Sequence, residues 1–155
     1  MTWLIFALMS VLSWGLYGVL LHSGQIAMAD PLNGRYKAFL FVGLAYTVTA
    51  VLGSLIVLLV NGATWNMPLK GISLSTVAGI AGALGAFGVL LAFGAKGTPS
   101  VVMSIIFAGA PVVNACVAMA MHPPTGGLTA LNWPFFLGIL LAASGGFLVS
   151  LYKPS

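Results

Sequence analysis

Long apolar runs separated by short polar connections make up almost the whole chain. Five runs are long enough to cross a hydrocarbon core of roughly 30 Å, which takes about 20 helical residues. They lie at about 2–21, 38–60, 72–95, 99–121 and 133–152. Lipid cannot hydrogen-bond a bare backbone, and no alternating barrel pattern occurs, so the runs predict helices. The pattern therefore predicts an all-α integral membrane protein with about five transmembrane helices, packed in one bundle as a single domain over residues 1–155.

The connections carry the residue types that favour turns. They are Asp30-Pro31-Leu32-Asn33-Gly34, Asn61-Gly62, Gly97-Thr98-Pro99 and the stretch from His122 to Gly127. The turn at Lys96–Pro99 is so short that the third and fourth helices should form an antiparallel hairpin. Ala27-Met28-Ala29 resembles a signal-peptide cleavage site, but no basic residue precedes the first run, and that run exceeds a usual signal core. We therefore keep the first run as a helix.

Composition supports a membrane location. Hydrophobic residues make up 61% of the chain and charged residues only 4%, against roughly a quarter in soluble domains. The six charged side chains lie between the apolar runs: Asp30, Arg35, Lys37, Lys70, Lys96 and Lys153. They are too few for the polar shell of a soluble protein and form no basic cluster. The net charge of +4 therefore indicates headgroup-level anchors and a lipid bilayer as partner, with no nucleic acid.

The basic residues also predict an orientation. Five spans place the termini on opposite sides, with Arg35, Lys37, Lys96 and Lys153 on one side and Lys70 alone on the other. The more basic side is expected to be cytoplasmic, so we expect a multi-pass protein of the inner (cytoplasmic) membrane, with its N-terminus out and its C-terminus in. Aromatic residues form two interfacial belts: Trp3, Trp65 and Trp133 on the poorly charged side, and Tyr36 and Tyr152 on the basic side.

Small residues indicate how the helices pack. Inside lipid, apolar burial no longer drives association, and close approach through small residues takes over. The third helix carries Gly79, Gly82, Gly85 and Gly88, and the fifth carries Gly138, Ala142 and Gly146. We expect the third helix to be central and to contact at least two others through its glycine and alanine faces. A phosphate-binding loop is a weaker interpretation, since it needs a preceding strand and a lysine.

Catalytic and metal chemistry is poorly provided for. Asp30 is the only carboxylate side chain, so paired-carboxylate catalysis is excluded. His22 and His122 fall at opposite membrane sides in this topology and cannot share a metal within one chain. The lone Cys116 allows no intrachain disulfide. We expect no enzyme activity, no metal and no cofactor.

Polar and aromatic residues within the runs are the candidates for a substrate path. Asn114 lies three residues after Pro111, which frees a carbonyl near Phe107 and favours a kink. An interhelical hydrogen bond from Asn114 is an equally good interpretation. Trp14 and Tyr17 lie one turn apart on the first helix and could line a cavity, although aromatic packing against neighbours explains them somewhat better.

The second helix offers three weaker candidates for the substrate path. They are Tyr46, Thr47 and Thr49. A threonine within a helix can bond its own helix backbone, so neither threonine by itself indicates a cavity.

The order of these features resembles a known family. The residues that carry the likeness are Ser13-Trp14-Gly15, Arg35-Tyr36-Lys37-Ala38-Phe39, Ala95-Lys96-Gly97-Thr98-Pro99, Ile106-Phe107-Ala108-Gly109-Ala110-Pro111-Val112 and the segment from Trp133 to Gly146. Together they resemble one repeat of the drug/metabolite transporter superfamily, EamA type. That resemblance implies a five-helix repeat, two of which, inverted, enclose a path for small metabolites.

The chain departs from that family in two ways. An acidic residue often follows the family's fourth helix, where this chain has Met121-His122-Pro123-Pro124, and only one repeat is present. The membrane-embedded glutamate of the related four-helix exporters has no equivalent here. The resemblance implies a half-size transporter subunit for a small metabolite, acting as a dimer or with a paired membrane chain, homo- or hetero-oligomeric. The alternative is a non-transporting membrane subunit or scaffold of a larger complex.

Overall fold

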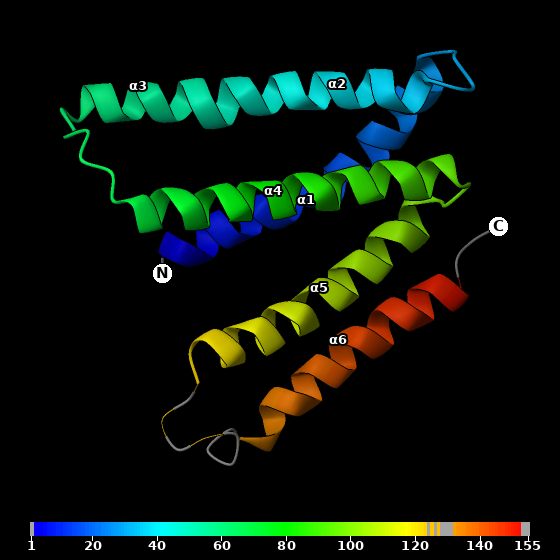
Figure 1. Ribbon diagram of the computed structural model, residues 1–155. Helices are drawn as coiled ribbons and strands as arrows, with labels where there is room; N and C mark the ends of the chain where they lie inside the picture. The colour runs from blue at the N-terminus through cyan, green and yellow to red at the C-terminus, as the bar shows by residue number, and fades with distance from the viewer. Residues whose placement is uncertain (1, 124, 126, 128–131, 153–155) are drawn as a thin grey trace. The chain divides into compact units, whose positions relative to one another are not determined.

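The computed structural model describes residues 2–123, 125, 127 and 132–152, and over these residues it is helical without strands. In chain order the helices are α1 (Thr2–Ala27), α2 (Gly34–Tyr46), η1 (Thr47–Leu52), α3 (Gly53–Val60), α4 (Leu69–Gly94), α5 (Pro99–Met121) and α6 (Trp133–Leu151). Figure 1 shows that α2 and α3 form one continuous rod. With this rod counted once, five helices of the described chain are long and apolar enough to cross a membrane, which confirms the predicted number.

The predicted boundaries differ most around the first connection. The helix expected over 2–21 continues to Ala27, and the one expected from 38 begins at Gly34. Apolar runs mark only the part of a helix that suits hydrocarbon, whereas the backbone stays helical until turn residues end it. The run expected over 99–121 coincides with α5, and Lys153 lies outside the described residues.

A π-helical turn, η1, interrupts the second membrane-length helix and was not predicted. The hydrogen bonding typical of a π-helix is seen at its C-terminal end, where the backbone N–H of Gly53 donates to the carbonyl of Val48, five residues earlier. The hydroxyls of Thr47 and Thr49 donate to backbone carbonyls one turn earlier, at 3.0 and 2.9 Å. Such back-bonding often bends helices, and π-turns are frequent at functional sites. The expectation that these threonines bond their own helix is confirmed.

The contacts divide the chain into two units, Met1–Ala95 and Lys96–Ser155. In the first unit α4 contacts both α1 and α2, which confirms the expected number of partners. The buried residues of α4 are Ala86, Val89, Leu90 and Phe93, so its four predicted packing glycines do not make these contacts. Phe93 meets His22 of α1 edge to face at 5.1 Å, and Phe87 stacks with Tyr36 of α2 at 6.4 Å. Leu90 between them is fully buried. These contacts hold the C-terminal half of α4 against α1 and α2.

The second unit is a pair of antiparallel helices, α5 and α6, lying side by side (Figure 1). The two helices approach each other closely at Gly146, where a Cβ atom would overlap that of Ala108 and lie 2.9 Å from the carbonyl oxygen of Ser104. Only a residue without a side chain allows this approach. The packing of the two units into one bundle, including the expected hairpin at Lys96–Pro99, stays a prediction.

Candidate functional site

The residues expected to form a substrate path lie in two places, one in each unit. The larger is a groove of about 700 Å³ between α5 and α6. Its lining is made by Pro111, Asn114, Ala115, Ala118, Met119, His122, Pro134, Phe135, Gly138, Ile139 and Ala142. Short side chains on both helices leave this space open, while the same helices touch further along at Gly146.

Pro111 and Asn114 are the two predicted path residues that line the groove. Pro111 lies inside α5 and has no backbone N–H, so the carbonyl one turn earlier has no helical donor. The Asn114 side chain is exposed and shares no hydrogen bond with another described residue. The interhelical bond considered from the sequence is therefore not formed between described residues.

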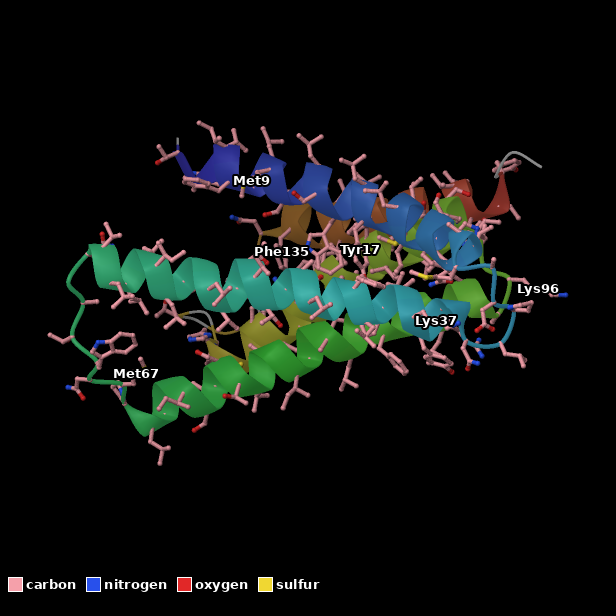
Figure 2. The ribbon with its side chains drawn as sticks, turned by 90° about the horizontal axis from the view of Figure 1, so that it is seen from above. Met9, Tyr17, Lys37, Met67, Lys96 and Phe135 are labelled. Carbon is pink, nitrogen blue, oxygen red and sulfur yellow. The ribbon has the colours of Figure 1, made fainter. Side chains whose placement is uncertain are left out.

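The smaller place is a pocket of about 180 Å³ between α1 and α2, lined by Ser13, Trp14, Tyr17 and Tyr46. The Trp14 and Tyr17 rings meet edge to face, with centroids 5.3 Å apart. Figure 2 labels Tyr17 on α1. Its hydroxyl oxygen is buried and lacks a hydrogen-bond partner among the described residues. Tyr46 is the last residue of α2, so the π-turn begins directly beside this pocket.

The four residues predicted from the sequence to line a path form two pairs in the structure, one pair in each unit. Trp14 lies with Tyr17, and Pro111 lies with Asn114. That the two pairs face each other across one cavity stays a prediction. The part played by Phe135 and His122 in the groove was missed, because the pattern of α6 showed only an apolar run and His122 was weighed only as a metal ligand.

The glycines expected to pack helices fall into two groups. Gly146 lies against α5, whereas a Cβ added at Gly138 would meet nothing within 4 Å. The same open space surrounds the glycines of α4: Gly79, Gly82, Gly85 and Gly88. Ala142, like Gly138, lines the groove. These four glycines of α4 therefore leave room for a further helix. That such a helix packs against them stays a prediction.

Charged groups gather at one end of the first unit. The Asp30 carboxylate accepts hydrogen bonds from the Lys37 ammonium at 2.7 Å and from the backbone N–H groups of Asn33 at 2.9 Å and Leu32 at 3.1 Å. The bond from Lys37, followed by that from Asn33, lowers the pKa of Asp30 from 3.8 to about 2. This carboxylate therefore stays ionised and fixes the α1–α2 connection.

Metal binding finds no support in the described part of the chain, where no group of three or more His, Cys, Asp or Glu side chains could hold an ion. No family model, curated protein or solved structure matches this chain. The geometry of the groove and the pocket is therefore the basis for the function proposed below.

Proposed function

We propose that this chain spans a membrane with five helices and supplies one half of a transporter for a small metabolite, similar to an EamA-like repeat. The observation that carries the proposal is the groove between α5 and α6. There Asn114, whose amide has no hydrogen-bond partner among the described residues, lines a space of about 700 Å³ beside Pro111, in the middle of a membrane-length helix. Polar groups inside a bilayer are costly and generally line a substrate path or bond another helix.

A second chain completes the path in this proposal. The groove opens along one side, and large apolar side chains cover the outer faces of all the helices, with few buried among the described residues. Such faces suit lipid and the smooth surface of another membrane chain. In inverted-repeat transporters the substrate lies between two oppositely inserted repeats, so the partner here is a five-helix chain inserted the other way up. A homodimer meets this requirement only if one copy inverts.

The proposed orientation places the N-terminus outside and the C-terminus in the cytoplasm of an inner membrane. Figure 2 shows Lys37 and Met67 at opposite ends of the first unit. The Lys37 end also carries Arg35, whereas Lys70 is the only basic residue of the Met67 end. By the positive-inside rule the Lys37 end is cytoplasmic.

Asn114→Leu tests the function, because it removes the hydrogen-bonding amide with little change in volume. Metabolite profiling of cells with and without the chain first identifies the transported compound, and its flux is then compared between variants. We expect flux to fall at least tenfold while expression and assembly are preserved. Val117→Leu is the control, since Val117 is exposed on α5 outside the groove.

Three results would contradict this proposal. Unchanged flux in Asn114→Leu would show that the amide lies off the path. Loss of assembly in that variant would assign the amide to helix–helix bonding. A chain that changes no metabolite level and sits at the edge of a larger complex would support the scaffold alternative.

A further inference from the structure

A second polar pocket lies at the charged end of the first unit, away from the aromatic pocket of Trp14 and Tyr17. It has a volume of about 370 Å³ and forms where the end of α1, the start of α2 and the end of α4 meet. Its lining includes His22, Gln25, Asp30, Arg35, Phe93 and Gly94. The substrate path proposed above uses none of these residues.

Three nitrogen atoms around this pocket are buried without a hydrogen-bond partner among the described residues. They are His22 Nδ1, Gln25 Nε2 and Arg35 Nε. The amide nitrogen of glutamine and the guanidinium of arginine can only donate. Buried donors are nearly always bonded, and leaving them unbonded costs stability. The pocket is therefore lined by residues with buried donors that lack an acceptor among the described residues.

The nearby carboxylate of Asp30 does not serve as this acceptor. Its Oδ2 atom accepts from Lys37, and its Oδ1 atom accepts from two backbone N–H groups. The described residues contain one ion pair, Asp30 with Lys37, and Arg35 is outside it. Asp30, Arg35 and Lys37 together leave one positive charge in excess, and it belongs to Arg35.

The backbone of α4 is shaped to admit the arginine. A Cβ atom added at Gly94 would overlap Arg35 Nη1 and lie 3.0 Å from Arg35 Cδ. The guanidinium thus lies directly over the glycine. Phe93, which packs on His22, lines the same pocket. The guanidinium carbon also lies 5.0 Å from the centre of the Tyr36 ring. These contacts hold the side chain beside the pocket, so its charge is positioned in advance.

We propose that this pocket binds an oxyanion, a phosphate or a carboxylate, through Arg35 and Gln25. A guanidinium offers paired donors that match both groups, and bonds between ionised partners are the strong ones. The oxyanion is either the headgroup phosphate of a membrane lipid or a free anion from the aqueous phase. Both share the same chemistry, and the position at the helix ends gives access to both. The site is independent of the transport path.

Two probes distinguish the sources in the purified full-length chain. Inorganic phosphate, titrated into detergent-solubilised protein and followed by thermal unfolding, reports a free anion. Native mass spectrometry with phosphatidylglycerol, compared with diacylglycerol, reports a lipid headgroup phosphate. Arg35→Gln should weaken binding of the relevant probe about tenfold or more, the scale of one charge-assisted bond. Lys70→Gln removes the same charge at the other end of α4 and should leave binding unchanged.

A steric variant covers the possibility that Arg35→Gln fails to fold. Gly94→Ala forces the end of the flexible arginine aside at little cost to the backbone, so it should fold and still bind severalfold more weakly. Gly88→Ala is its control, because nothing lies within 4 Å of the added methyl group. If neither probe binds, or if binding falls equally in Arg35→Gln and Lys70→Gln, the site is refuted.

Discussion

The contact between Gly146 and Ala108 offers a sharp test of the second unit. Gly146→Ala adds one methyl group to α6 where it would overlap the Ala108 Cβ and lie 2.9 Å from the Ser104 carbonyl oxygen. Carbon atoms in contact are normally about 3.5–4.0 Å apart. The obstacle is helix backbone and a Cβ attached to it, neither of which can swing aside. The two helices must therefore separate locally.

The size of the effect follows from two opposing terms. Overpacking of a close contact typically costs about 1–3 kcal/mol. Replacing glycine by alanine within a helix returns up to about 1 kcal/mol. We therefore expect Gly146→Ala to lower the free energy of unfolding by about 0–2 kcal/mol relative to the parent, and by about 1–3 kcal/mol relative to a helical Gly→Ala change without the clash.

The assay is reversible unfolding in mixed micelles with increasing SDS, followed by circular dichroism. Gly145→Ala is the matched control, one residue earlier on α6, with nothing within 4 Å of the new methyl group. It should be neutral or slightly stabilising. Adding Ala108→Gly to Gly146→Ala should recover part of the loss, since the carbonyl of Ser104 still restricts the methyl. Equal stability of Gly146→Ala and Gly145→Ala would refute the close packing.

Three further outcomes are expected. Folding lowers the pKa of Asp30 from 3.8 to about 2. The ionised carboxylate should therefore stabilise the fold above pH 3.8, and this contribution should be lost as the pH falls to about 2. The same pH dependence of the free energy of unfolding in the parent and in Asp30→Asn would contradict this. In a Cys116→Ser background, an impermeant thiol reagent applied to intact cells should label a cysteine at Trp65 but not at Lys96, and the reverse pattern would invert the orientation. A Cβ atom added at Gly82 would meet nothing within 4 Å outside its own helix. Gly82→Leu should therefore leave unfolding of the isolated chain unchanged yet weaken association with a second chain; unchanged association would show that this face contacts lipid only.

The lengths of the apolar runs predicted the number and order of the membrane-length helices, because a helix must be about 20 residues long to cross the hydrocarbon core. They could not predict η1. A π-turn depends on a shift in backbone hydrogen bonding, and Thr47 and Thr49 fit an α-helix equally well. Helix ends were predicted well where proline or tryptophan marks them, as at Pro99 and Trp133, and less well where the helix passes through the interface.

The sequence could predict which site residues lie together only where they belong to the same helix. Pro111 and Asn114 are one turn apart, so their shared groove followed from spacing. The pocket around Arg35 depends on three helices meeting at Gly94, and the sequence alone indicated only a headgroup anchor. The glycines of α4 look alike in sequence, yet the buried contacts of that helix fall later, at Leu90 and Phe93. The spacing of the glycines shows which positions of a helix lack side chains, but it does not show which neighbouring helix packs against them.

The central claim is that two chains enclose one path. Native mass spectrometry of the chain, released from its own membranes with a mild detergent, tests this claim most directly. We predict a particle of two five-helix chains, either two copies or one copy with a different partner. A chain that is released only as a monomer would contradict the account.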